Sequence, residues 1–168
     1  MKNFFRFKNK NIHLATTYFY QLRFFKDNMI PLSICIYDPK WYKNDGGFNI
    51  KEFVPIDYNS NLDCENCHKL HKDDPLYNGN LNCRYLKEYR KQLKNLNIEK
   101  IIKEQCWKIL NSKKYKQQIE KYNDVYLVFV GFEVPDKLCS ERFILANYIE
   151  ENLNIHCKEL KYPIIDNY

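Results

Sequence analysis

The chain has 168 residues, the usual length of one globular domain, which can bury about 70% of the surface that an extended chain exposes. Lys and Arg number 27 against 21 Asp and Glu, so the net charge is +6, a mild excess that is typical of an ordinary solvated surface and attracts phosphate-bearing partners only weakly. Aromatic residues make up 16% of the chain, a share that excludes an intrinsically disordered protein.

The first ten residues alternate Phe with Lys, Arg and Asn, and they lack the apolar segment and cleavage site of a signal peptide. No window approaches the length of uncharged apolar sequence that a transmembrane helix needs, so no membrane partner is expected. Seven cysteines without a secretion signal indicate a reducing compartment. The composition therefore predicts a cytoplasmic protein.

Two strands are predicted in the first quarter of the chain. Residues 11–25 are rich in Thr, Tyr and Phe, and their first half has the pattern of a strand. Residues 30–37 form a second apolar run that ends at Asp38-Pro39. Lys40 and Trp41 lie in the loop that follows. From residue 48 the sequence loses any clear period, and we expect a long irregular Cys-containing insertion over residues 48–82.

Helical periodicity returns after this insertion. Leu86, Tyr89, Leu93 and Leu96 recur on one face, which predicts an amphipathic helix. Asn97 has the side chain of a helix cap and precedes a second apolar stripe at helical spacing. A short third helix is expected after residue 112.

An unbroken apolar run over residues 125–130 has the pattern of a strand that is covered on both faces. Gly131 and Pro135 interrupt it, a helix is predicted over residues 143–153, and a short strand over residues 156–160. This order predicts an α/β fold, a small mostly parallel sheet flanked by helices, in a single domain over residues 1–168.

The loop between the apolar strand and its helix concentrates reactive and charged side chains: Glu133, Cys139, Glu141 and Arg142. Ligands of open α/β sheets bind at the carboxyl ends of the strands, where this loop would lie. Cys139 would sit at a helix N-terminus, where the helix dipole and Arg142 favour a thiolate and where backbone N–H groups can bind an anion.

If the two apolar strands are parallel, Lys40 and Trp41 would lie at the same edge of the sheet. We therefore expect one concave site for a small anionic or nucleotide-like ligand, in a binding protein or an enzyme. Its parts would be Cys139 as nucleophile or anion anchor, Arg142 and Lys40 as charge clamps, Glu133 or Glu141 as acid or base, and Trp41 as a stacking surface. The simpler alternative is that Cys139 caps the helix and Trp41 only packs.

Four pieces of sequence carry a resemblance to a known family. They are Pro31-Leu-Ser-Ile-Cys-Ile with Pro39-Lys-Trp-Tyr42, Tyr85-Leu-Lys-Glu-Tyr89 with Leu93, Glu133-Val-Pro135 with Cys139, and Ala146-Asn-Tyr-Ile149 with Ile155-His-Cys-Lys-Glu159. In these motifs the chain resembles the domain of unknown function 488 family, small α/β proteins with a Cys-His-Arg signature. The resemblance covers about residues 30–160 and implies the same fold. Here the signature reads Cys139-Ser-Glu-Arg142, so Glu141 or Glu133 would have to replace the missing His if that His were a catalytic base.

The insertion contains a possible metal site. Cys64 and Cys67 form a C-x2-C knuckle, and Cys83 follows at the spacing of a zinc ribbon. Three thiolates favour zinc, and His71 is preferred to His68 as fourth ligand because His68 directly follows Cys67. A structural zinc would stabilise a segment that has no core of its own. Free thiols, or a redox pair of Cys64 and Cys67, are the alternatives.

A different class of function is also possible. The helix that begins near residue 86 carries a basic face, which could bind phosphate in a zinc-stabilised nucleic-acid-binding or regulatory module. An ordinary solvated helix face explains the same pattern more simply. The residues of this face are Lys87, Arg90, Lys91 and Lys94.

Overall fold

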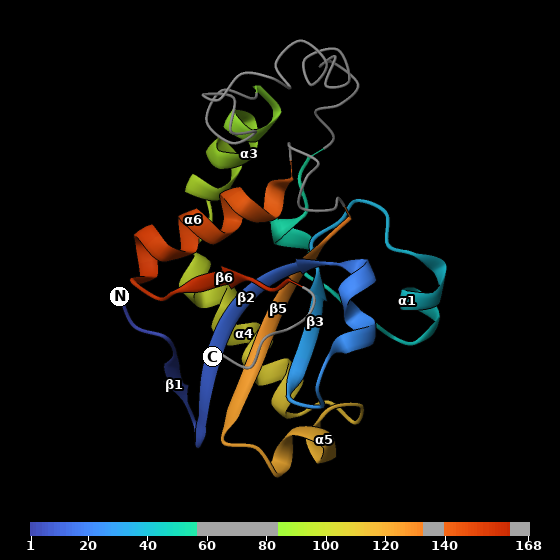
Figure 1. Cartoon of the computed structure of the whole chain (residues 1–168). Helices are drawn as coiled ribbons and strands as arrows, with labels where there is room; N and C mark the ends of the chain where they lie inside the picture. The colour runs from blue at the N-terminus through green and yellow to red at the C-terminus, as the bar shows by residue number, and fades with distance from the viewer. Residues whose placement is uncertain (57–83, 133–139, 162–168) are drawn as a thin grey trace.

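The computed structural model describes residues 1–56, 84–132 and 140–161 of the chain. These residues form an α/β fold in which a six-stranded, mostly parallel sheet is flanked by helices, as predicted (Figure 1). The strands are β1 (Phe5–Phe7), β2 (Lys10–Tyr18), β3 (Met29–Ser33), β4 (Phe48–Asn49), β5 (Asp124–Gly131) and β6 (Cys157–Glu159). The helices are η1 (Phe19–Phe24), α1 (Lys40–Asn44), η2 (Lys51–Phe53), α3 (Arg84–Lys94), α4 (Ile98–Leu110), α5 (Lys116–Glu120) and α6 (Glu141–Leu153), where η marks a 3-10 helix.

The sheet is built around β5. Strand β5 lies between β2 and β3 and is parallel to both, with Ile12 opposite Val125 and Leu32 opposite Phe129. Strand β4 continues the sheet beyond β3, and β6 is parallel to β2 on the side of β2 that faces away from β5. Strand β1 is antiparallel to the start of β2. The parallel strands β2, β3, β5 and β6 therefore all end at one edge of the sheet.

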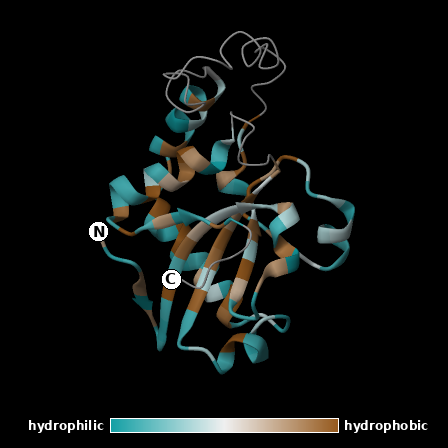
Figure 2. Cartoon of the chain, in the orientation of Figure 1, coloured by the Kyte–Doolittle hydropathy of each residue, from teal (hydrophilic) through white to brown (hydrophobic). Residues whose placement is uncertain are grey.

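The main core lies on one face of the sheet, under α3, α4 and α6. Leu14, Leu127 and Phe129 point to this face and are buried together with Leu86 of α3 and Leu145 of α6. In Figure 1 helix α4 lies behind the sheet and α3 and α6 lie above, and Figure 2 shows that the hydrophobic residues concentrate on the strands. A smaller cluster on the opposite face joins η1 and α1 to the sheet. Because β5 is buried from both sides, its apolar run is uninterrupted, as expected for such a strand.

Helix α4 begins where the sequence predicts. The side chain of Asn97 accepts a hydrogen bond from the backbone N–H of Lys100 at 3.0 Å, the contact of an N-terminal cap. Helix α6 ends at Asn154, which has a φ of 53°, the left-handed conformation that Asn adopts more readily than most residues. Local side-chain chemistry thus sets one end of each of these two helices.

The structure differs from the predictions in several places. Strand β3 ends at Ser33 rather than at residue 37, and the backbone N–H of Cys35 donates to the hydroxyl of Ser33. Lys40 and Trp41 begin the short helix α1 rather than lying in a loop. The first residues assigned to the insertion form β4 and η2, and Phe53 is fully buried where the hydroxyl of Tyr89 donates to its carbonyl oxygen at 2.7 Å. Strand β1 was not predicted. Residues 57–82 of the predicted insertion lie outside the described residues. Among the described helices, none has the length and apolar character needed to cross a membrane.

Candidate functional site

An aromatic groove of about 740 Å³ runs along the edge where the parallel strands end. It is formed by the segments that follow β2, β3 and β5, which meet here because those strands are parallel neighbours. The residues that line it are Tyr18, Phe19, Tyr20, Leu22, Arg23, Pro39, Trp41 and Phe132. We call it the edge groove.

The floor of the edge groove is Phe19, which is 8% exposed. The rings of Trp41 and Phe19 form a T-shaped pair with centroids 5.8 Å apart and planes at 86°, and the ring of Phe132 lies 6.1 Å from that of Phe19 at 68°. These contacts hold the two outer rings while leaving Trp41 50% and Phe132 61% exposed. Exposed, positioned ring faces of this kind are suited to stacking against a planar group.

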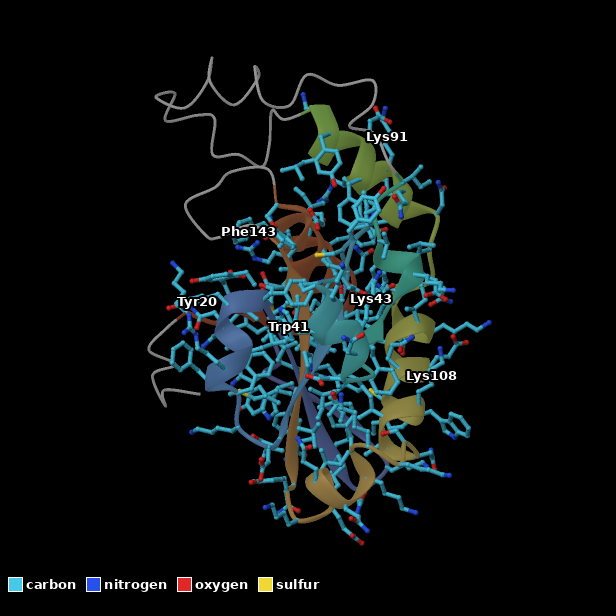
Figure 3. All side chains as sticks on the ribbon, turned by 90° about the vertical axis from the view of Figure 1, so that its right-hand side faces the viewer. Tyr20, Trp41, Lys43, Lys91, Lys108 and Phe143 are labelled. Carbon is cyan, nitrogen blue, oxygen red and sulfur yellow. The ribbon has the colours of Figure 1, made fainter. Side chains whose placement is uncertain are left out.

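A cation is stacked on one wall of the edge groove. The guanidinium carbon of Arg23 lies 3.2 Å from the ring centre of Tyr20, and Nε of Arg23 donates to the Tyr20 carbonyl oxygen at 3.2 Å. Tyr20 itself is 58% exposed. Figure 3 looks at this side of the molecule and shows Tyr20 and Lys43 on either side of Trp41. The groove therefore presents positive charge next to aromatic surface.

A network of polar contacts fixes the segment that carries Trp41. Asp38 accepts hydrogen bonds from the hydroxyl of Ser33 and from Nδ2 of Asn49, the latter at 3.2 Å. The hydroxyl of Tyr42 donates to the carbonyl oxygen of Pro31 at 3.0 Å. Burial raises the pKa of Tyr42 above its ordinary value, so this residue is a neutral donor at physiological pH. The turn after β3 is thus tied to the ends of β3 and β4.

Arg142 lies behind the groove rather than in it. Its side chain is fully buried; Nε donates to Oε1 of Glu159 at 3.0 Å, and Nη1 donates to Oγ of Ser140 at 2.6 Å. Glu159 also accepts from the hydroxyl of Thr16 at 2.6 Å. A Cβ on Gly131 would lie 3.3 Å from this guanidinium, so the strand end leaves room for it. The arginine ties the start of α6 to β6 and β2.

The structure places the other predicted site residues as follows. Lys40 is exposed at the start of α1, beside Trp41. Glu141 is 4% exposed in the first turn of α6. Glu133 and Cys139 lie outside the described residues, although Glu133 directly follows the groove residue Phe132 in the sequence. The sequence predicts that Lys40, Trp41, Glu133, Cys139 and Arg142 share one concave site. Arg142 is fully buried and does not line the groove, and that Glu133 and Cys139 join Lys40 and Trp41 stays a prediction.

The predicted zinc ligands Cys64, Cys67, Cys83 and His71, together with the alternative His68, also lie outside the described residues. Within residues 1–56, 84–132 and 140–161, no group of three or more His, Cys, Asp or Glu side chains could hold a metal ion. The zinc site therefore stays a prediction.

The cysteines that the structure describes are buried: Cys35, Cys106 and Cys157. Burial raises the pKa of the Cys106 thiol to about 12, and burial followed by the nearby carboxylates of Glu150 and Glu159 raises that of Cys157 above its ordinary value. Cys106 and Cys157 are consequently protonated and unreactive at neutral pH.

Carboxylates partly neutralise the basic face of α3. Arg90 forms an ion pair with Glu151 of α6, and Nζ of Lys91 lies 2.7 Å from Oε1 of Glu88. Lys87 and Lys94 are exposed. Two of the four cations thus have acidic partners on the protein, which weakens the case for this face as a phosphate-binding surface.

The sequence predicts Trp41 as a site residue but not Tyr20, Arg23 or Phe132. Phe132 comes directly after the predicted buried strand, and Tyr20 and Arg23 follow the first strand within five residues of its end. Their position directly after parallel strands was the signal in the sequence that could have identified them as site residues. It could not be used because the aromatic run Tyr18-Phe-Tyr20 continues the strand pattern past the end of β2.

Comparison of the chain with protein-family models, with curated proteins and with solved structures gave no match. The resemblance to the domain of unknown function 488 family therefore rests on the motifs quoted for it.

Proposed function

We propose that the protein binds a nucleotide, or a nucleotide unit of a larger molecule, in the edge groove. One observation carries this proposal: exposed rings from the ends of three neighbouring strands line one groove together with a stacked guanidinium. The ring faces of Trp41 and Phe132 provide stacking surface for a planar base, and Tyr20 holds the guanidinium of Arg23 beside them. Arg23 and Lys40 provide positive charge for a phosphate.

The position of the groove supports the same function. In open parallel sheets the ligand lies beyond the carboxyl ends of the strands, and the edge groove is at those ends. Cys139 and Glu133, the predicted nucleophile and acid or base, belong to the segment that joins Phe132 to Ser140. We propose that this segment supplies any reactive groups, with the ligand held by the groove.

Tryptophan fluorescence tests the binding step directly, because the chain has two tryptophans and one of them is in the groove. The variant Trp107→Phe keeps Trp41 as its single reporter. Titration with ATP and with uridine monophosphate is expected to quench Trp41 saturably, since stacking of a base on an indole changes its emission.

The matched control is Trp41→Phe, which keeps Trp107, an exposed residue of α4. Its emission is expected to stay constant in the same titrations. Equal responses from the two variants, or no response of Trp41 to any mononucleotide or oligonucleotide, would refute binding in the edge groove.

A further inference from the structure

We infer that the occupant of the edge groove is a stretch of single-stranded nucleic acid several nucleotides long. This inference rests on the proposed function and names its substrate class. Sites for small ligands typically bury 70–90% or more of the ligand. The edge groove is instead wide and open, because its outer rings are half exposed or more: Trp41 50%, Tyr20 58% and Phe132 61%. A mononucleotide would remain largely in water here, whereas an extended strand would contact the whole groove.

The aromatic rings form separate stacking positions. Tyr20 belongs to η1, Trp41 to α1, and Phe132 to the end of β5, so the three rings come from three different segments. Trp41 and Phe132 each meet the ring of Phe19, with centroids at 5.8 and 6.1 Å. Proteins that bind single strands without base pairing use such a series of aromatic platforms, one for each of several bases.

The charge around the edge groove complements a phosphate backbone. Residues 18–27 and 34–45 flank the groove and carry four cations, Arg23, Lys26, Lys40 and Lys43, and three carboxylates, Asp27, Asp38 and Asp45. Asp27 forms an ion pair with Lys121. The carboxylate of Asp38 is engaged by Ser33 and Asn49. Lys40 and Lys43 are exposed and three residues apart on α1, so they lie on the same side of this helix, where they can contact the phosphates next to a base stacked on Trp41.

Single-stranded rather than duplex nucleic acid follows from the chemistry of stacking. In a duplex the base faces are already stacked on their neighbours, so rings such as Trp41 could reach them only after unpairing. The groove chemistry does not distinguish ribose from deoxyribose, since it uses base faces and phosphates.

The test is fluorescence anisotropy with dye-labelled oligo(dT) and oligo(rU) of increasing length, with uridine monophosphate as competitor. We expect affinity to rise with length and to level off at roughly 4–16 nucleotides. A duplex of equal length should bind more weakly. The slope of log affinity against log salt should be about −0.7 for each phosphate contact, and Lys40→Ala with Lys43→Ala should make it less steep.

Substitutions locate the binding surface. Trp41→Ala should weaken oligonucleotide binding by roughly 5- to 150-fold, the measured range for removing one stacked base–ring contact. Trp107→Ala removes an exposed tryptophan from α4 and should leave binding unchanged. The pair Lys108→Ala and Lys116→Ala changes the net charge equally on α4 and α5 and should alter the salt slope less than the α1 pair does.

The outcomes separate this inference from the proposed function. Binding of uridine monophosphate as tight as that of a long oligonucleotide would overturn the inference and leave nucleotide binding intact. Equal affinity for single strand and duplex, or equal effects of Trp41→Ala and Trp107→Ala, would also overturn it. If no nucleotide and no oligonucleotide binds, both the proposed function and this inference are refuted. A preference for oligo(rU) or for oligo(dT) identifies the sugar and supports the inference either way.

Discussion

Lys10 is a buried cation whose ammonium group is held entirely by backbone oxygens. It is 6% exposed, and Nζ donates to the carbonyl oxygens of Ile119 at 3.0 Å and Glu120 at 2.9 Å, and also to that of Tyr122. These carbonyls lie at the end of α5, where a helix leaves its last oxygens without intrahelical partners and where the dipole favours a positive charge. One lysine from β2 thus caps a helix more than a hundred residues later in the sequence.

Replacing Lys10 with Met should therefore destabilise the protein by at least about 2 kcal/mol, because a hydrogen bond to a charged group contributes about 1.5–3 kcal/mol and the carbonyls would remain buried. Urea unfolding followed by circular dichroism measures the change. Lys116→Met, an exposed position on α5, is the control and should change stability by less than about 0.5 kcal/mol. Equal stability of the two variants would show that the cap contributes nothing.

Asp124 at the start of β5 offers a pH-dependent contact. Its Oδ1 accepts from Nε2 of His13 at 2.8 Å and from Nδ2 of Asn11 at 3.1 Å. The hydrogen bond from His13, followed by that from Asn11, lowers the pKa of Asp124 below its ordinary value of 3.8. The ionised carboxylate of Asp124 therefore stabilises the folded protein more than the protonated carboxyl does.

A lowered pKa means that this stabilisation is present above pH 3.8 and is lost as the pH falls through the lower value of the folded state. Asp124→Asn keeps the shape and removes the charge. At pH 7 we expect the variant to be less stable by under about 1 kcal/mol, since the carboxylate is half exposed. The difference from wild type, measured by thermal unfolding, should shrink below pH 3.8; a difference that grows on acidification would contradict this.

At the scale of single elements, α1 is positioned by a close approach between Tyr42 and Gly47. A Cβ on Gly47 would lie 2.4 Å from ring atoms of Tyr42. Tyr42 is 3% exposed, and its hydroxyl is within hydrogen-bond distance of the carbonyl oxygens of Pro31 in β3 and Phe48 in β4. The ring cannot move without breaking those hydrogen bonds. Only glycine fits at this position.

Gly47→Ala should consequently destabilise the protein by about 1–3 kcal/mol, the usual cost of overpacking, and should displace α1. Because Trp41 precedes Tyr42 on that helix, the emission of Trp41 in the Trp107→Phe background should shift as well. Asn44→Ala, an exposed position on the same helix, is the control. An unchanged emission together with unchanged stability would show that α1 tolerates the extra methyl group.

Helices and strands with a clear hydrophobic pattern of their own could be predicted from the sequence. Short strands that form only by pairing with a neighbouring strand could not. Strand β5 and helix α4 were predicted because both faces of β5 are covered and because Asn97 caps a regular apolar stripe. Strands β1 and β4 have three and two residues, and they exist because β2 and β3 offer an edge to pair with. No local pattern encodes such a pairing.

The same distinction applies to the site. The sequence indicated the correct edge for Trp41, since that followed from two strong strands and the rule for parallel sheets. It also assigned Arg142 to the ligand, whereas the structure encloses that side chain with Glu159 and Ser140. The partner Glu159 lies on β6, and which side of β2 this strand occupies is set by tertiary packing.

For the molecule as a whole, the seven cysteines provide a joint test of the zinc and Cys139 predictions. Cys35, Cys106 and Cys157 are buried. If Cys64, Cys67 and Cys83 bind zinc with His71, Cys139 is the one thiol left to react in the native protein. Elemental analysis should give about one zinc per chain on this ligand set.

Iodoacetamide should then modify the native protein at Cys139 alone, as read by peptide mass spectrometry, because a thiolate at a helix N-terminus reacts fastest. After chelation, Cys64, Cys67 and Cys83 should react as well. Cys67→Ser should abolish zinc binding and His71→Ala should weaken it, whereas His156→Ala serves as a control histidine. A metal-free protein would refute the zinc prediction, and modification of the other thiols before Cys139 would refute its reactivity.

The central place of β5 also has a consequence for how the chain is made. Strands β2 and β3 do not pair with each other, and both pair with β5. The hydrogen bond between Asn11 of β2 and Asp124 of β5 joins residues 113 positions apart in the sequence. As the polypeptide leaves the ribosome, the first two strands therefore emerge with unpaired edges long before their common neighbour is synthesised. Contacts this distant close slowly, and open strand edges are prone to association in the meantime. A nascent chain stalled before residue 124 has left the ribosome should bind chaperones that recognise exposed apolar strands, and it should release them once residue 131 has emerged.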